Sequence, residues 1–412
     1  MIKNMAFLLN AFVFRGDVDM VFLIHYIKFF ILLVSSGLAV VSCSSYPDLP
    51  EGDAGDRDAR IKKYLDALIA EDRFPGIQYM VLDQKGVLFE YAVGNAVIDK
   101  VPMTLKSPMM IYSATKVITA AAILKLVDQG RLTLDDTLEQ YLPSIPYPGI
   151  SLRHVLTHSS GIPNPIMGNF YVHSEAEVGT FDKQSLLKDV LRDNPGLQFP
   201  AGSDFDYSNL GYALLGEVIE SVSNKSYEQY IEEEILKPLM IENNQASFTF
   251  NTFSSESRGY VQKFSIFNAI ASFMLEGFTS QIQGRWKTYK EHWYFNYPAH
   301  GGLISNAPSV SIFLRDQLST RSKLMSQTQK KEFYRIQKPA ESSPMRSTDI
   351  AIAWFVNRDA YEMYYFHEGS AFGYVTEMRI YPESAIASVL LVNATKIPHK
   401  NLMDMIDAQF QN

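Results

Sequence analysis

The sequence predicts a mixed α/β fold of the α+β type, in which an antiparallel sheet flanked by helices carries an inserted all-helical domain. Three observations support this prediction. A helix and a β-hairpin begin the mature chain, a long helical stretch fills its middle, and a series of strands followed by one helix closes it. Because the strands at both ends must cover their apolar faces, they most simply join in one sheet.

The first elements are a helix and a hairpin. Residues 58–72 have apolar side chains at 61, 64, 65 and 68, which lie on one face of a helix. Two β runs, Ile77–Leu82 and Val87–Val93, follow. The short connection between them contains Gly86, as expected of a hairpin turn.

The middle of the chain is predicted to be helical. A helix begins at Ser113 and runs to about Gln129, and its apolar stretch Ala120–Leu124 indicates that it is buried. Gly130 follows as a C-cap. Further helices are expected at 210–221 and 308–318, and capping boxes at 133–136 and 226–229 predict two more helix starts.

The C-terminal part changes to strands beyond Asp349. The expected strands are 351–356, 362–366, 375–380 and 387–392, and a last helix covers about 402–410. We therefore expect an α/β sandwich domain from 57–110 and 295–412, with a mainly helical domain from 111–294 between its halves.

The N-terminus is expected to be a targeting segment. The apolar run 29–41 follows Lys28 and is too short for a comfortable membrane span, which is typical of a signal peptide. It ends at Val-Val-Ser before Cys43, a pattern similar to a bacterial lipobox in which the cysteine is acylated. The alternative is a buried free cysteine. Residues 1–43 are then the signal, with a true start possible at Met20, and 44–56 form a tether.

Composition excludes several functions. The net charge is −8 and there is no basic run, which argues against nucleic acid as a partner. The single cysteine excludes an intramolecular disulfide and a cysteine-rich metal site. We expect no metal and no cofactor, and the sequence does not determine the oligomeric state.

The first candidate for chemistry opens the buried helix. Ser113 and Lys116 are three residues apart, so their side chains share a helical face. A neutral or well-paired lysine can take the proton of a serine and make it a nucleophile. The pair Ser185 and Lys188 has the same spacing, but it lies in an ordinary polar helix and is expected to be a surface pair.

Two later segments carry further candidates. Tyr207 and Asn209 form a Y-x-N motif just before a helix, where a tyrosine can transfer protons if nearby cations lower its pKa. The alternative is an ordinary helix cap. The Y-x-N at Tyr294 is not followed by a helix, so Tyr207 is preferred.

The third segment, 367–370, ends a strand with His367, Glu368, Gly369 and Ser370. A glycine there lets a substrate approach the strand edge closely. The similar H-x-G at His300 is expected to be a structural turn.

Together these motifs resemble the serine β-lactamase and penicillin-binding-protein superfamily, whose signature is S-x-x-K, a tyrosine or serine motif, and K-T-G. The Y-x-N form is like that of class C β-lactamases. The stretches 151–163 and 301–305 also look similar, so the resemblance spans about residues 57–410. It implies a β-lactamase/transpeptidase-like fold with the active site between the two domains.

The resemblance also implies roles for the site residues. Ser113 would form the acyl-enzyme, and Lys116 and Tyr207 would handle protons. Asn209 would orient Lys116 and substrate, while His367 would take the place of the K-T-G lysine. The backbone N–H groups of Ser113 and Ser370 would form the oxyanion hole.

The anion at Glu368 departs from the family pattern. Enzymes that act on penicillin or on a peptide C-terminus hold a carboxylate near this position, which Glu368 would repel. The alternative is that Glu368 points into solvent or pairs with an arginine. We therefore expect an esterase or peptidase-like hydrolase of a small or peptide-like substrate. A β-lactamase or D,D-carboxypeptidase is the alternative, and a non-catalytic envelope lipoprotein is a second one. Lipid on Cys43 would anchor the protein in the bacterial cell envelope, on the periplasmic or outer face.

Residues 250–298 hold thirteen aromatic side chains without one clean period. Two interpretations stay open from the sequence. The segment is either a mobile cover over the active-site cleft or plain core of the helical domain.

Overall fold

The computed structural model describes residues 46–50, 56–165, 172–174, 182–263, 279–337, 349–395 and 397–411. Residues 47–412 belong to one compact unit. The predicted signal segment 1–43, with Cys43, and most of the predicted tether 44–56 lie outside the described residues. Within the described part, no helix has the length and hydropathy needed to cross a membrane.

An eight-stranded antiparallel sheet joins the two ends of the chain. The strand order is β12-β13-β14-β15-β16-β1-β2-β3, and the register places Ile77 of β1 opposite Val392 of β16. The predicted antiparallel sheet is therefore confirmed. Its strands are β1 (Gly76–Asp83), β2 (Val87–Val97), β3 (Val101–Pro102), β12 (Asp349–Ile350), β13 (Phe355–Arg358), β14 (Met363–Ser370), β15 (Val375–Tyr381) and β16 (Ile386–Val392).

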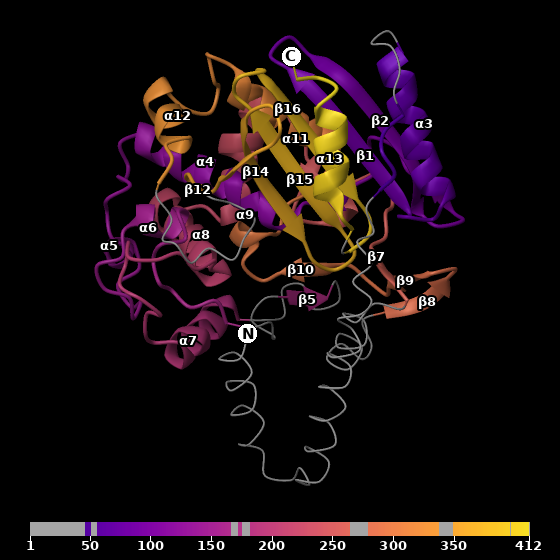
Figure 1. Ribbon diagram of the computed structural model, residues 1–412. Helices are drawn as coiled ribbons and strands as arrows, with labels where there is room; N and C mark the ends of the chain where they lie inside the picture. Colours follow the sequence, from indigo (N-terminus) through magenta and orange to yellow (C-terminus); the bar gives the residue numbers. More distant parts are fainter. Residues whose placement is uncertain are drawn as a thin grey trace, which may run out of the picture. The chain divides into compact units, whose positions relative to one another are not determined.

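Helices cover both faces of this sheet, which explains why β1 is buried along nearly its whole length. Successive side chains of a strand point to opposite faces. The Tyr79 hydroxyl donates to Asp407 of α13 (His399–Asp407) at 2.6 Å. The neighbouring Gln78 side chain instead accepts from the backbone of Ala307, in α11 (Ala307–Leu318), at 2.8 Å. In Figure 1, α13 lies in front of the sheet and α11 behind it.

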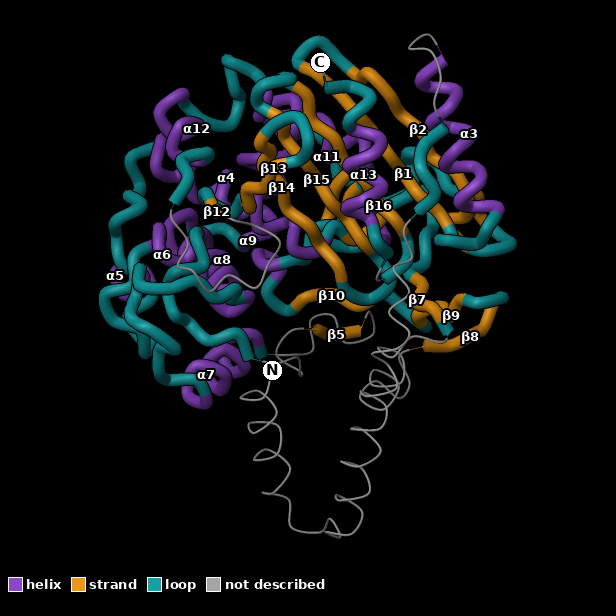
Figure 2. The backbone as a smooth tube through the Cα atoms, viewed as in Figure 1, coloured by secondary structure: helices purple, strands orange, loops and turns teal. Residues whose placement is uncertain are grey.

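The remaining helices gather mainly beside the sheet, as Figure 2 shows for α5, α6, α7 and α8. The helix α4 is buried on nearly all sides, as its apolar sequence predicts. The elements are α3 (Arg57–Ala70), η2 (Tyr112–Ala114), α4 (Thr115–Asp128), α5 (Leu138–Tyr141), α6 (Leu152–Leu156), α7 (Lys183–Asp193), α8 (Asn209–Ser223), α9 (Tyr227–Ile231), η4 (Glu232–Leu236), η5 (Lys237–Leu239), η6 (Phe250–Thr252), η7 (Pro298–His300) and α12 (Gln327–Phe333).

Short strands also occur in the stretch 111–294, which the sequence predicts to be mainly helical. Three small sheets contain them, in the orders β4-β11-β6, β10-β5 and β7-β9-β8. Their strands are β4 (Met109–Met110), β5 (Val172–Ser174), β6 (Ala246–Ser247), β7 (Tyr260–Gln262), β8 (Thr279–Gln283), β9 (Trp286–Tyr289), β10 (Trp293–Phe295) and β11 (Ile304–Ser305). The division into two domains at the predicted boundaries stays a prediction.

Two local expectations are wrong. Only the end of the predicted strand 351–356 is a strand, as part of β13, and residues 351–354 form a turn between β12 and β13. Within that turn Ala353 has a positive φ of 59° and its N–H donates to the carbonyl of Leu156. The predicted capping box at Thr133 does not begin a helix. Asp136 instead accepts hydrogen bonds from both the backbone and the hydroxyl of Thr133, which closes a turn. The capping box at Ser226 does begin α9.

The described aromatic residues of 250–298 mostly belong to the core. Tyr260 and Trp286 are 0% and 1% exposed, and the Trp286 indole N–H donates to Asp72 at 2.6 Å. For these residues the structure supports the interpretation as plain core. Residues 264–278 of the segment lie outside the described residues, so a cover formed there stays a prediction.

Candidate active site

The nucleophile candidate Ser113 lies in a strained turn before a buried helix. The preceding residue, Tyr112, has a φ of +46°, which is unusual for a bulky residue and costs about 1–3 kcal/mol. Its buried side chain is fixed because the hydroxyl donates to the carbonyl of Phe372 at 3.0 Å. The short helix η2 then turns the chain into α4, leaving Ser113 partly exposed.

Lys116 is fully buried and contacts no carboxylate among the described residues. Its amino nitrogen lies 2.8 Å from Oδ1 of Asn209, 2.6 Å from the carbonyl oxygen of His300 and 3.3 Å from Oγ of Ser113. Burial lowers the pKa of Lys116 well below its usual value. In its neutral form the amine can donate to the two uncharged acceptors and still accept from the Ser113 hydroxyl through its lone pair.

Tyr207 completes the environment of the Ser113 hydroxyl. Burial raises the pKa of Tyr207 above its usual value, and only a hydrogen bond with Ser113 lowers it. The tyrosine ring stacks near His158, with centroids 4.4 Å apart, and lies 4.7 Å from the amino nitrogen of Lys116. Burial disfavours the charged form of Lys116, and no cation lowers the pKa of Tyr207, which is the condition for its acting as a base. The phenol stays protonated and is suited to relay a proton.

The loop 151–165 holds the Y-x-N segment in place. Asn209 is the first residue of α8, and its N–H donates to Oδ1 of Asn164 at 3.1 Å. Ser208 caps the helix by accepting from the N–H of Gly211, and its own N–H donates to Nδ1 of His158 at 3.2 Å. These bonds explain why the 151–163 stretch accompanies the motif.

His154 and His158 are four residues apart, a spacing that can hold a metal on a helix. The structure separates their roles, because α6 ends at Leu156 and His158 has a positive φ of 54°. Nδ1 of His154 accepts from the N–H of Ser151 in a capping box, whereas His158 serves Ser208. The two imidazoles therefore have structural partners.

The end of β14 lies against the nucleophile turn. The strand β13 pairs with β14 only as far as Phe366, so residues 367–370 have no strand partner on that side within the described chain. A side chain at Gly369 would place its Cβ 2.1 Å from the carbonyl oxygen of Ile111 and 2.9 Å from the backbone nitrogen of Ser113. Glycine is required here so that the strand can reach the turn, a closer contact than the predicted substrate approach. Ser370, the last residue of β14, is exposed.

His367 faces the core side of the sheet and is 1% exposed. Burial is the main reason why the pKa of His367 is lowered to about 3, so the imidazole is neutral. Its Nδ1–H donates to the carbonyl of Glu368 at 2.8 Å. The residue in the predicted place of the K-T-G lysine therefore brings no positive charge.

Glu368 points to the opposite face of the sheet. In the β14–β15 register it pairs with Glu377, whereas His367 pairs with Met378. The Glu368 carboxylate lies 3.1 Å from Nε2 of His399, and the side chain is 38% exposed. This orientation differs from the expectation that Glu368 faces a substrate carboxylate, although the field of Glu368 still raises the pKa of Tyr207.

The rejected motifs lie elsewhere. Ser185 and Lys188 are exposed on α7, away from the Ser113 contacts. Asn296 of the second Y-x-N contacts the ring of His173 at 2.6 Å. His300 has a role that its side chain does not predict, because its backbone carbonyl accepts from Lys116. No pattern of side chains could have indicated a main-chain acceptor so far along the sequence.

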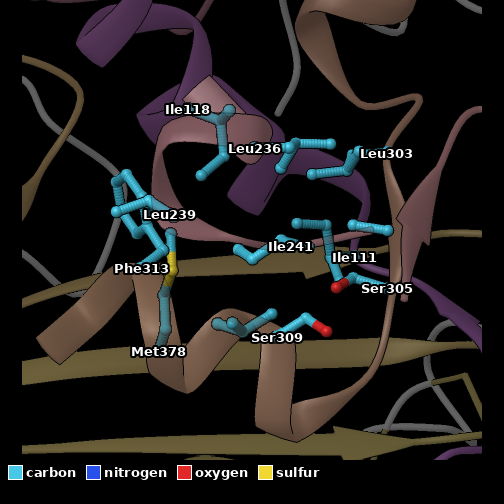
Figure 3. Close-up of a pocket in the computed structure, with 12 residues that line it drawn as sticks. Ile111, Ile118, Leu236, Leu239, Ile241, Leu303, Ser305, Ser309, Phe313 and Met378 are labelled. Carbon is cyan, nitrogen blue, oxygen red and sulfur yellow. The ribbon is translucent and has the colours of Figure 1, made fainter. Parts of the chain in front are cut away.

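A small apolar cavity lies behind the nucleophile turn and has a volume of about 20 Å³. Figure 3 shows Ile111, Ile118, Leu239, Phe313 and Met378 around it. It has room for about one water molecule, but its mostly apolar walls give water few partners. It is a packing gap of the core and not a substrate pocket.

A serine, a buried lysine, a tyrosine and an asparagine thus converge around one partly exposed hydroxyl. Known proteins are similar to this chain over most of its length. A family model described as Beta-lactamase matches residues 61–410. Protein flp of Staphylococcus aureus (strain N315) is 26% identical over 373 residues, covering 87% of this chain and 67% of that protein. Penicillin-binding protein 4* of Bacillus subtilis (strain 168) is 33% identical over 155 residues, covering 37% of this chain and 34% of that protein.

Solved structures share the fold. A penicillin-binding protein homologue from Pyrococcus abyssi has a TM-score of 0.69 at 24% identity, covering 85% of this chain and 76% of that one. The D-amino acid amidase from Ochrobactrum anthropi SV3, complexed with L-phenylalanine amide, has a TM-score of 0.71 at 21% identity, covering 87% and 99%.

Proposed function

This chain belongs to the β-lactamase family, and on that premise we propose that it is a serine hydrolase in which Ser113 forms an acyl-enzyme with an ester or amide. Family membership supports hydrolase activity in general.

The contact between Lys116 and Ser113 carries the proposal. A buried lysine without a carboxylate partner is costly unless it is neutral. Here both of its acceptors, on Asn209 and His300, are uncharged, and the third direction leads to the Ser113 hydroxyl at 3.3 Å. A lysine with a purely structural role would not need to contact the hydroxyl of a partly exposed serine.

Acylation then follows from these contacts. Neutral Lys116 takes the proton of Ser113 as the serine oxygen attacks the carbonyl carbon of the substrate. The backbone N–H groups of Ser113 and Ser370 stabilise the oxyanion. The C–O or C–N bond breaks, Tyr207 gives its proton to the leaving group, and Lys116 returns a proton to Tyr207.

Deacylation uses the same groups in reverse. A water molecule replaces the departed alcohol or amine, and Tyr207 and Lys116 accept its proton as its oxygen attacks the acyl carbon. Ser113 recovers a proton and the acid is released. This cycle needs no cofactor, since every proton is carried by side chains already in contact with Ser113.

The charges around the site favour substrates without a carboxylate next to the scissile bond. Burial lowers the pKa of both Lys116 and His367, which disfavours their charged forms. Among the described residues, no arginine and no second lysine contacts the side chains of Ser113, Tyr207 and Asn209. Neutral esters and amides, or substrates that carry an amine, are therefore the proposed class.

Two other functions are weaker alternatives. A β-lactamase or D,D-carboxypeptidase must hold a carboxylate, for which this site offers no cation among the described residues. A non-catalytic envelope lipoprotein would not need to retain a buried neutral lysine against a serine. The D-amino acid amidase among the similar structures favours an amide of an amine-bearing acid as the first substrate to assay.

A substrate panel tests this proposal. We expect kcat/KM to be highest for a p-nitrophenyl ester or D-phenylalanine amide and at least about tenfold lower for a cephalosporin, whose carboxylate meets no cation. The Ser113→Ala variant serves as the blank for each substrate. A cephalosporin hydrolysed faster than both neutral substrates would contradict the proposed substrate class.

A further inference from the structure

Two carboxylates meet behind the active-site end of β14. Glu368 of β14 and Glu377 of β15 are direct cross-strand partners, and both side chains lie on the face that α13 covers. Like charges directly opposite each other destabilise a strand pair. Glu377 is only 1% exposed, so water does little to screen this repulsion. A positive group is needed between them.

His399 occupies that place. It is the first residue of α13, and its Nε2 lies 3.1 Å from Oε2 of Glu368 and 3.0 Å from Oε2 of Glu377. Its Nδ1 lies 3.0 Å from the carbonyl oxygen of Ile397, so Nδ1–H donates there and the ring orientation is fixed. Both ring nitrogens then face acceptors only, which requires a hydrogen on each and hence an imidazolium.

The network continues into the helix. Arg379, fully buried, donates to Oε1 of Glu377 at 2.5 Å and to Asp404 of α13 at 2.7 Å. Its guanidinium and the His399 imidazolium together offset the carboxylates that surround them. Burial opposes protonation of His399, but the hydrogen bonds and charges of both glutamates outweigh it and raise its pKa to about 9.

The anchored residue is adjacent in sequence to the groups that face the nucleophile. Gly369, next to Glu368, packs against the backbone of Ser113, and Ser370 follows with its N–H in the proposed oxyanion hole. A side chain fixed at Glu368 limits how far this backbone can move.

We infer that His399 is a positioning residue, which as an imidazolium holds Glu368 and Glu377 together and so fixes the active-site end of β14. The inference rests on the proposed function, because it concerns the reaction at Ser113. His399 does not touch the substrate. It acts by keeping the carboxylate of Glu368 neutralised and turned from Ser113.

The pH dependence has a definite sign. The titratable groups facing His399 are Glu368 from β14 and Glu377 from β15, with Arg379 behind Glu377 and Asp404 and Asp407 on α13 itself. Because the pKa of His399 is raised in the folded protein, its stabilising contribution is complete below about pH 6.5 and is lost as pH rises through about 9. Above that range the imidazolium no longer offsets the charge of Glu368.

A charge-rescue experiment tests the inference. The measured quantities are the labelling rate of Ser113 by a neutral fluorophosphonate and by a penicillin, together with Tm from pH 6 to 10. At pH 7.5 we expect His399→Gln to slow labelling by the fluorophosphonate roughly tenfold, because the imidazolium no longer offsets the charge of Glu368. Labelling by the penicillin, which carries a carboxylate, should slow more. Adding Glu368→Gln to that variant should restore the rate to within about twofold of wild type. In the single and in the double variant, Tm should no longer fall near pH 9.

The results separate a positioning role from a packing role. If the double variant labels as slowly as His399→Gln, or more slowly, His399 is only a packing residue and the inference fails. A fall in Tm near pH 9 that persists unchanged in His399→Gln also overturns the inference. If Zn²⁺ raises Tm in the wild type but not in His399→Gln, the cluster of Glu368, Glu377 and His399 is a metal site instead. If the wild type takes neither label, the proposed function has failed, and the Tm profile alone then decides whether His399 clamps β14.

Discussion

The amino nitrogen of Lys116 lies 3.3 Å from the hydroxyl oxygen of Ser113, while its other two close contacts are uncharged oxygens. This relationship sets the proton chemistry of the site. A lysine in this environment can act as a base, because burial lowers its pKa and no carboxylate among the described residues contacts it to raise it again. A carboxylate placed next to Lys116 would reverse that condition.

Asn209→Asp should shift the acidic limb of the pH–rate profile upward. The new carboxylate would accept from Lys116 in place of the amide oxygen, and an opposite charge in contact raises a lysine pKa by about one to three units. Activity at pH 7 should fall and recover as pH rises. The kcat/KM profile from pH 5 to 10 measures this, with Asn357→Asp on β13 as an isosteric control. A limb that does not move would mean that Lys116 is not the base.

Tyr207→Phe and Tyr212→Phe should separate catalysis from stability. The Tyr207 hydroxyl forms a hydrogen bond with the Ser113 side chain. Its removal should therefore lower kcat by about 10²–10⁴-fold with little change in Tm. The Tyr212 hydroxyl instead donates to the buried carbonyl of Leu156 at 2.9 Å, and its loss should cost about 1 kcal/mol of stability with activity retained. Equal kinetic effects of the two changes would refute the role of Tyr207.

Gly369→Ala should displace the nucleophile turn. The added Cβ would lie within 3 Å of the backbone of both Ile111 and Ser113, so either β14 or the turn must move. A displacement near 1 Å at a reacting group costs about 10²-fold in rate. Gly86→Ala is the matched control, since nothing lies within 4 Å of that Cβ. If the Gly369→Ala variant is labelled and turns over substrate as fast as Gly86→Ala, this contact does not position the nucleophile.

How far the sequence predicted this site depends on the kind of contact. Asn209 and Tyr207 were predictable because they lie at the start of a helix whose apolar spacing is clear. The spacing of Ser113 and Lys116 places their side chains on one helical face. The sheet was predictable from its alternating strands. The split at Ala353 was not, since it depends on a hydrogen bond to Leu156 in another element.

The environments of these residues were less predictable than their positions. The acceptor that holds Lys116 is a backbone carbonyl at His300, which has no side-chain signature. The orientation of Glu368 follows from its register with Glu377 and from the place of His399 in the last helix. Both depend on packing between segments far apart in the chain, and this packing also determines which groups are charged.

Cys43 lies outside the described residues, and its acylation is a separate proposal. We expect the mature chain to begin at Cys43 and to carry lipid that anchors it in the bacterial envelope. Cys43→Ser should leave unprocessed or soluble protein in a fractionation experiment. Mass spectrometry that finds an unmodified Cys43 inside a longer mature chain would contradict the anchor and leave the active site unaffected.

The most direct measurement of the central claim is the site of covalent labelling. A fluorophosphonate probe, followed by peptide mass spectrometry, should place the adduct on Ser113 in the wild type. Ser113→Ala should take no label and lose at least about 10³-fold in kcat while remaining folded. Ser185→Ala, the exposed serine with the same lysine spacing, should behave like the wild type. Turnover or labelling that survives in Ser113→Ala would contradict the account.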